Sequence, residues 1–206
     1  MQRHADRTPA RHDPGVVLRR LFGLMVLVAG LFLLGKAVAV RAEGLAWQAA
    51  ESVRFDLLRA APTAITPPRP GEALARLRVD RLGLEVMVAE GSDGETLALG
   101  PGHMRKSALP GAPGNCIIAG HRDAEFRRLR DIRAGDLIDL NGWSGAARYR
   151  VTAIRIVDRD ETALLAQSDE ARLTLVTCYP FYYFGPAPQR FVVQAELVEA
   201  EVAGRR

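Results

Sequence analysis

The pattern of apolar and polar positions divides the chain into one long apolar run near the N-terminus and a following region of short alternating segments. Residues 21–40 form the run, twenty residues with a single charge, Lys36, close to one end. As an α-helix rising about 1.5 Å per residue, the run spans about 30 Å, the thickness of the hydrocarbon core of a bilayer. We therefore predict an uncleaved transmembrane anchor at 21–40, with a cleaved signal peptide or a buried core helix as the alternatives.

The residues before this run carry most of the chain's excess positive charge. Residues 1–20 hold five arginines against two aspartates and form an Arg-rich tail. Positive flanks of membrane helices stay on the cytoplasmic side, so the tail is expected in the cytoplasm and the bulk of the chain outside it. This predicts a single-pass protein of the cytoplasmic membrane with an extracytoplasmic domain.

Residues 41–71 connect the apolar run to the remainder of the chain. The segment 41–60 is rich in alanine and suits a helix without a clean amphipathic stripe, which favours a spacer. The segment 61–71 contains four prolines, and proline lacks the backbone donor that a helix needs. The second segment is therefore predicted to be a linker, which leaves 72–206 as a single domain.

Beyond this linker the period of the apolar positions shortens to two, as expected for β-strands. Strand-like segments separated by Gly, Pro, Asp and Asn lie at 73–79, 84–88, 116–119, 136–140, 147–157, 172–177 and 190–198. Short helical turns are predicted at 94–99 and 124–132. Seven or eight strands at this spacing indicate a mainly β domain built as a closed or nearly closed β-barrel.

The distribution of charge and the spacing of the cysteines exclude several classes of function. The chain has a formal net charge of +4, yet residues 71–206 carry eighteen Lys and Arg against nineteen Asp and Glu. A domain without positive excess has little attraction for a phosphate backbone, so nucleic acid is not an expected partner. The two cysteines do not stand in a pair with metal-ligand spacing. We therefore expect neither a metal site nor a cofactor.

Three residues stand where strands begin or end and could together carry out nucleophilic catalysis. Cys178 follows the strand at 172–177, and a cysteine is nucleophilic only as a thiolate beside a cation or an imidazole. His121 follows a glycine at the end of an apolar strand. Arg190 opens the last strand, and its guanidinium can stabilise an oxyanion. Each residue alone also has a structural interpretation, and only the combination points to catalysis.

The same residues resemble the signature of the sortase family. The resemblance rests on Thr174-Leu175-Val176-Thr177-Cys178, on an arginine twelve residues later, and on Gly120-His121 about sixty residues before the cysteine. Further similar segments are Leu82-Gly83-Leu84, Gly100-Pro101-Gly102-His103 and Gly111-Ala112-Pro113-Gly114-Asn115. The resemblance covers about 74–197. It implies a sortase-like closed eight-stranded β-barrel with short helices, preceded by a transmembrane helix.

The resemblance also implies an activity and roles for individual residues. Cys178 would attack the carbonyl of a C-terminal sorting signal similar to Leu-Pro-x-Thr-Gly and form a thioacyl enzyme. His121 would serve as acid and base, Arg190 would steady the oxyanion, and Thr177 would line the substrate groove. His103 either borders this groove or has a structural role at a strand start. The implied partners are a secreted substrate protein with that signal and an amine acceptor in the cell envelope or on a protein.

Several alternatives remain open at this point. Cys116 lies on the opposite strand face from His121 and is predicted to be buried filler. Asp123 could orient His121, and the aromatic run 181–184 either contacts substrate or membrane or packs as a lid. The long loop 179–188 resembles that of the sortase variant found in Gram-negative bacteria.

Two other classes of function compete with a transpeptidase. One is a catalytically inactive, membrane-anchored β-domain that binds an extended peptide by strand addition, which would have no need of a strand-end thiol. The other is a thiol redox protein that uses both cysteines, although the chain has no Cys-x-x-Cys motif.

Overall fold

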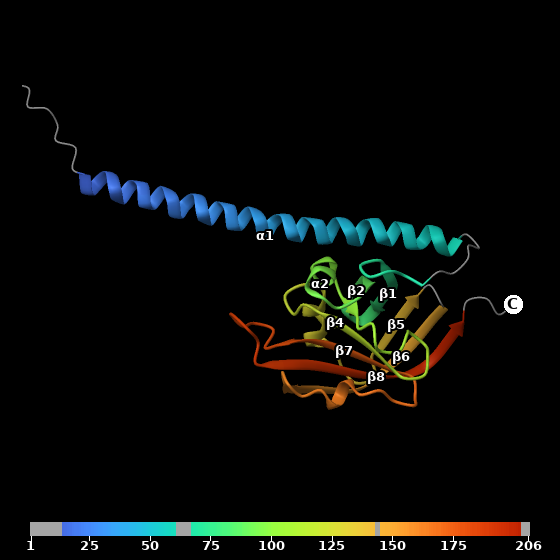
Figure 1. Ribbon diagram of the computed structural model, residues 1–206. Helices are drawn as coiled ribbons and strands as arrows, with labels where there is room; N and C mark the ends of the chain where they lie inside the picture. The colour runs from blue at the N-terminus through green and yellow to red at the C-terminus, as the bar shows by residue number, and fades with distance from the viewer. Residues whose placement is uncertain (1–13, 61–66, 143–144, 203–206) are drawn as a thin grey trace, which may run out of the picture. The chain divides into compact units, whose positions relative to one another are not determined.

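The apolar run is part of one long helix, α1, which spans Pro14–Ala60 (Figure 1). The structure is a computed structural model that describes residues 14–60, 67–142 and 145–202. Within these ranges, Val17–Leu57 is the one helical stretch long and apolar enough to cross a membrane. The chain forms two compact units, 1–42 and 43–206. In the first unit the large apolar side chains of α1 are exposed, as membrane insertion requires.

Two predicted segments lie partly outside the described residues. Of the Arg-rich tail at 1–20, only 14–20 is described, and it belongs to α1. Of the proline-rich linker at 61–71, only 67–71 is described. The predicted domain boundaries therefore stay predictions.

The second unit contains eight strands that close into a barrel. Their order around the barrel is β1-β2-β3-β4-β7-β8-β6-β5, and β5 pairs back to β1. Neighbouring strands are antiparallel except for two parallel pairs, β2 with β3 and β4 with β7. The elements are β1 (Ala73–Val79), η1 (Asp80–Leu82), β2 (Leu84–Glu90), α2 (Gly94–Leu99), β3 (Gly102–His103), β4 (Asn115–Gly120), η2 (Glu125–Asp131), β5 (Leu137–Gly142), β6 (Gly145–Asp158), η3 (Ala163–Leu165), β7 (Arg172–Tyr179) and β8 (Gln189–Val202).

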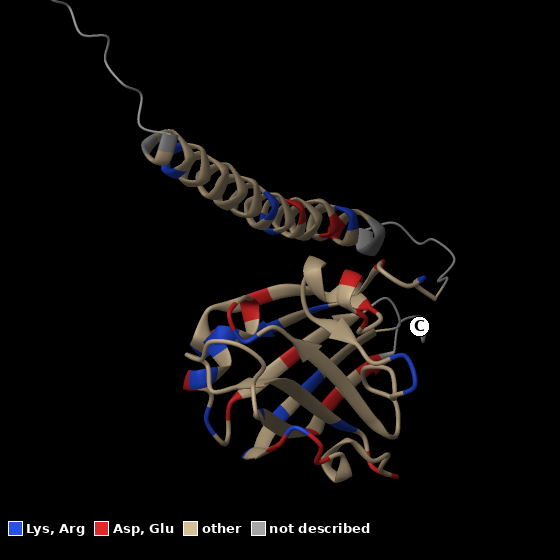
Figure 2. Ribbon diagram, turned by 60° about the vertical axis from the view of Figure 1, so that its left-hand side comes forward, with Lys and Arg blue, Asp and Glu red and all other residues tan. Residues whose placement is uncertain are grey.

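This architecture confirms the predicted eight-stranded barrel with short helices. The seven strand-like segments correspond to seven of the strands, and the helical turn predicted at 94–99 is α2. The additional strand, β3, has only two residues, so it shows no period that a sequence pattern could reveal. Charges of both signs are interspersed over the barrel (Figure 2), in agreement with its near balance of basic and acidic residues.

Because side chains alternate along each strand, every second one lies in the barrel interior. Leu173 and Leu175 of β7 are fully buried, as are Cys116 and Ile118 of the neighbouring strand β4. The prediction that Cys116 is a buried core residue is confirmed. Burial, together with the nearby carboxylate of Glu90, raises the pKa of the Cys116 thiol to about 12.

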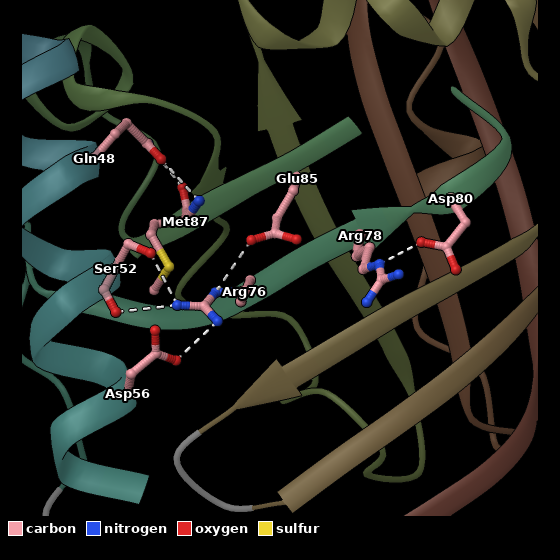
Figure 3. A network of polar contacts seen from close by, with 8 residues as sticks. All are labelled: Gln48, Ser52, Asp56, Arg76, Arg78, Asp80, Glu85 and Met87. Atoms are coloured by element: carbon pink, nitrogen blue, oxygen red, sulfur yellow. Dashed lines mark hydrogen bonds and ion pairs between the residues drawn. The ribbon is translucent and has the colours of Figure 1, made fainter. Parts of the chain in front are cut away.

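The last part of α1, residues 43–60, packs on the backbone of the barrel (Figure 3). The Gln48 side chain accepts a hydrogen bond from the amide of Met87 at 2.8 Å and donates to the carbonyl of the same residue at 3.0 Å. It also donates to the Leu99 carbonyl at 3.2 Å. A glutamine amide thus pairs with β2 as a neighbouring strand would, which satisfies backbone groups on an open side of the strand.

A second contact joins the same part of α1 to β1 (Figure 3). Arg76 donates to the backbone carbonyl and the hydroxyl of Ser52 at 3.0 and 2.9 Å. It also forms an ion pair with Asp56 at 2.8 Å, and its guanidinium lies 5.4 Å from the centroid of the Phe55 ring. The segment predicted to be a spacer is therefore also a packed part of the barrel unit.

Candidate active site

The three residues proposed for catalysis are brought together by strand register. In the parallel pair β4–β7, Gly120 is opposite Thr177, so His121 and Cys178 occupy the next position, just beyond the β4 ladder. In the antiparallel pair β7–β8, Cys178 is opposite Arg190. Residues directly opposite each other on neighbouring strands project from the same face. The register therefore aligns Cys178 with Arg190, and His121 follows the end of β4 at the level of Cys178, so the three residues form a row at the ends of neighbouring strands. The strands β4, β7 and β8 lie side by side in the barrel (Figure 1).

Alternation along β7 leaves Cys178 accessible between buried neighbours. Leu175 and Thr177 face the interior and are 0% and 2% exposed. Cys178 points the other way and is partly exposed, with a free thiol. Cys116 is opposite Leu173 at the other end of the β4–β7 pair, so the two cysteines are not placed to react with each other. This arrangement argues against the thiol redox hypothesis.

His121 stands at the turn between β4 and η2, and it is exposed. Its carbonyl accepts a hydrogen bond from the amide of Ala124 at 3.4 Å, which starts the turn into η2. Among the described residues, no hydrogen bond joins Asp123 to the His121 ring, so the hypothesis that Asp123 orients the imidazole gains no support. An exposed imidazole beside a thiol can exchange protons with a substrate amine.

Arg190 is held by backbone carbonyls at the end of the loop that precedes β8. Its Nη1 donates to the carbonyl of Gln189 at 2.9 Å and to that of Ala187 at 3.3 Å. Within the described part of the chain, its remaining guanidinium nitrogens have no hydrogen-bond partner. A guanidinium stays protonated at every physiological pH, so it can favour a thiolate nearby and bind a developing oxyanion.

Thr177 is not presented to solvent. Its hydroxyl donates a hydrogen bond to the carbonyl of Gly120 at 2.7 Å. This bond ties the end of β7 to the end of β4, directly before Cys178 and His121. The side chain can position these two residues, and a direct contact with substrate, as predicted from the sequence, would need a backbone atom of Thr177. Its substrate-binding role stays a prediction.

His103 lies in a buried polar cluster and is 1% exposed. Its Nδ1 is 2.8 Å from Oε2 of Glu90, and its Nε2 is 3.0 Å from both the Ala108 carbonyl and the Ser107 hydroxyl. Every polar atom of the ring is therefore engaged inside the fold, which favours the structural interpretation of His103. Its part in substrate binding also stays a prediction.

The outer face beside the reactive row is apolar. Val176 is opposite Ala119 on one side and Val192 on the other. Because alternation gives residues two apart the same face, these three side chains lie on the face that carries His121, Cys178 and Arg190. Val192 is only 2% exposed, whereas Ala119 and Val176 are partly exposed. An extended peptide that reaches Cys178 could therefore rest an apolar side chain on Ala119 and Val176.

The loop between β7 and β8 comprises residues 180–188. Its aromatic run, 181–184, is divided between core and surface. The Phe181 ring packs against Phe191 and Tyr179, with centroids 5.1 and 5.9 Å apart. Phe184 is fully exposed. The lid interpretation therefore holds for Phe181 only, and the tip of the loop is available for contact.

Over the described ranges, no three or more His, Cys, Asp or Glu side chains gather to hold a metal ion. The groups at the strand ends are a thiol, an imidazole and a guanidinium, which can together serve acyl transfer through a thioester.

Comparison with known proteins gives one consistent match. A family model described as the sortase domain matches residues 77–198. Sortase D of Bacillus subtilis is 35% identical over 132 residues, which are 64% of this chain and 67% of that protein. Sortase A of Listeria monocytogenes is 29% identical over 129 residues, 61% of this chain and 56% of that protein. The solved structure of a Clostridium perfringens sortase D5 transpeptidase has a TM-score of 0.59 and 29% identity, over 64% of this chain and 82% of that one. These matches leave the Gram-negative subgroup a prediction.

Proposed function

Because the chain belongs to the sortase domain family, with a match over residues 77–198, we propose that it is a membrane-anchored cysteine transpeptidase. It cleaves a C-terminal sorting signal similar to Leu-Pro-x-Thr-Gly and transfers the new carboxyl end to an amine. The substrate is a secreted protein that carries the signal, and the acceptor is an amine of the cell envelope or of a protein.

The observation that carries this proposal is the row made by strand register. Cys178 is opposite Arg190 in the β7–β8 ladder, and His121 is the next position after the Gly120–Thr177 pair. A binding module would have no need of an accessible strand-end thiol between an imidazole and a guanidinium. The row therefore favours catalysis over the alternative of an inactive peptide-binding domain.

In the first half of the reaction, the Cys178 thiolate attacks the carbonyl carbon of the scissile peptide bond. The carbonyl oxygen takes the negative charge, and the Arg190 guanidinium stabilises it. The carbon–nitrogen bond then breaks, and the departing amine takes a proton from the His121 imidazolium. The products are a thioester on Cys178, a neutral imidazole and the released C-terminal fragment.

The second half reverses these steps with a new amine. The acceptor amine attacks the thioester carbonyl and gives a proton to the His121 imidazole. The carbon–sulfur bond breaks, and Arg190 favours the sulfur as thiolate. The enzyme returns to its starting protonation state, and a new amide bond joins the substrate protein to the acceptor.

The proposal is tested by trapping the thioester on the full chain in detergent. Peptides with a Leu-Pro-x-Thr-Gly-like signal are incubated with wild type, Cys178→Ala and Cys116→Ala, and the intact mass is measured with and without hydroxylamine. We expect a hydroxylamine-sensitive adduct on wild type and on Cys116→Ala, and none on Cys178→Ala. Saturable peptide binding without any adduct would support the inactive peptide-binding domain, and an adduct lost only in Cys116→Ala would reverse the assignment of the nucleophile.

The proposed location follows from the helix and from the charges beside it. Residues 21–40 span the inner membrane, the tail at 1–20 is cytoplasmic, and the domain at 72–206 lies on the periplasmic side. α1 supports this location because its stretch Val17–Leu57 is long and apolar enough to cross a membrane. Protease added outside spheroplasts should degrade the domain, and full protection of the domain would reverse the topology.

A further inference from the structure

The loop 180–188 begins two residues after Cys178 and ends two residues before Arg190, so its position affects both. Its outer half does not pack on the core. Tyr182, Tyr183 and Phe184 are 67%, 48% and 103% exposed. What holds this half of the loop is a set of arginines that follow His121 in the turn after β4 and in η2.

The strongest of these contacts comes from the residue directly after His121. Nη2 of Arg122 donates to the backbone carbonyls of Tyr183 and Gly185, at 3.0 and 3.1 Å. Its guanidinium carbon lies 5.7 Å from the centroid of the Tyr183 ring. Arg122 therefore contacts the loop through main-chain atoms, and this contact does not depend on the identity of the loop side chains.

Two further arginines, both in η2, support the same half of the loop. The guanidinium of Arg127 lies 4.8 Å from the centroid of the Tyr182 ring, and that of Arg130 lies 6.0 Å from it. Arg130 also donates a hydrogen bond to the Tyr182 hydroxyl. These contacts are exposed, and contacts between exposed groups contribute little each. The two hydrogen bonds of Arg122 are exposed as well, but they restrain the loop backbone at two points, which the ring contacts of Arg127 and Arg130 do not.

We propose that Arg122 is a positioning residue, which fixes the loop 180–188 to the strand end that carries His121. This inference rests on the proposed transpeptidase function. A loop tied to the His121 segment holds its exposed half beside the strand ends that carry Cys178 and Arg190, where an extended peptide would have to bind. Without this contact the outer half of the loop is less ordered, and binding of the peptide must supply the free energy that orders it.

The chain contains a matched control for this contact. Nη1 of Arg128 donates to two consecutive backbone carbonyls, those of Leu82 and Gly83, at 3.0 and 3.1 Å. The two arginines thus make the same kind of bond at almost the same distances. Arg128 restrains the turn between β1 and β2, which contributes no residue to the reactive row.

The experiment compares Arg122→Ala, Arg122→Lys and Arg128→Ala in the full chain in detergent. Thioester formation is measured against peptide concentration, and amide hydrogen exchange of residues 181–187 is measured without substrate. In Arg122→Ala we expect kcat/KM to fall by about tenfold, mainly through KM, with faster exchange in the loop. A lysine ammonium can donate to the carbonyls but lacks the planar guanidinium that lies against the Tyr183 ring, so Arg122→Lys should recover only part of the loss.

Arg128→Ala should lose a similar amount of thermal stability as Arg122→Ala, while its KM stays within about twofold of wild type. If both variants change KM equally, or if loop exchange in Arg122→Ala equals that of wild type, the positioning role is wrong. A wild-type protein that forms no thioester with any signal peptide would refute the proposed function. The exchange measurement, which uses no substrate, would still decide whether Arg122 restrains the loop.

Discussion

The buried hydrogen bond of Thr177 provides a test of how the site is held together. Its hydroxyl donates to the Gly120 carbonyl at 2.7 Å. Cys178 directly follows Thr177 in the chain, and His121 directly follows Gly120. Thr177→Val keeps the shape of the side chain and removes the donor. The substitution should therefore loosen the two strand ends against each other without leaving a cavity.

The size of the effect follows from the burial of the bond. A hydrogen bond contributes about 0.5–1.5 kcal/mol net, and a buried acceptor left without its partner costs about 1–3 kcal/mol. Thr177 is 2% exposed, so we expect a loss of about 1–2 kcal/mol. With a urea m-value of about 2 kcal/mol/M, the unfolding midpoint should fall by about 0.5–1 M.

The same pair of strands offers a control at its other end. The Thr174 hydroxyl, 1% exposed, donates to the side-chain oxygen of Asn115 at 2.7 Å. Thr174→Val should therefore cost a similar amount of stability, about 1–2 kcal/mol. Two quantities are measured for each variant. Urea unfolding is monitored by near-ultraviolet circular dichroism, and the rate of thioester formation is measured separately. We expect only Thr177→Val to lower kcat/KM, by about tenfold, because it alone shifts the strand ends next to Cys178 and His121.

Equal activities in the two valine variants at equal stability would refute the reasoning. So would a Thr177→Val protein with wild-type kcat/KM, because the hydroxyl would then position neither reactive residue. A change in KM alone, with unaltered kcat, would instead favour the sequence-based assignment of Thr177 to substrate binding.

Three further predictions concern charge and protonation. Arg190→Lys keeps the charge but loses the planar fork, so kcat/KM should fall by about tenfold or more. The loss should not exceed the about 2.7–4 kcal/mol expected for one oxyanion donor. Near-normal steady-state rates would make Arg190 a structural charge. Because the pKa of Cys116 is raised to about 12, iodoacetamide at pH 9 should alkylate Cys178 in the folded protein and leave Cys116 unmodified. The folded state holds the Cys116 proton more tightly than the unfolded chain, so stability should fall as the pH rises from about 8.5 towards 12. Cys116→Ala should weaken this dependence in unfolding experiments at graded pH, and the part that remains includes Tyr149, whose pKa is also raised by burial.

Local periodicity was enough to predict most of the barrel. The strand predicted at 73–79 has the bounds of β1, because its alternating side chains must be half buried wherever the strand lies in the sheet. The predicted burial of Cys116 holds for the same reason. The two-residue strand β3 has no such pattern, since its pairing is decided by β2 and β4 on either side.

The candidates Cys178, His121 and Arg190 could be chosen from their residue types and their places at strand ends. Their meeting in one row could not be derived from those places, because it depends on the β4–β7 and β7–β8 registers, which join segments far apart in the chain. The sortase resemblance implied that these residues act together, and the register gives the physical reason why they lie at neighbouring strand ends.

The tertiary structure alone decided which polar side chains bond to main-chain atoms. Gln48 satisfies the backbone of β2 from 39 residues away, and Arg122 holds a loop carbonyl 61 residues along the chain. Neither residue has a pattern around it that indicates its partner, since a main-chain carbonyl is the same group at every position. Hydrophobic pattern is a property of a segment, and it was enough to predict the strands and the long apolar helix. A side chain-to-backbone bond is a property of two segments, and it forms only where the closed barrel brings them together.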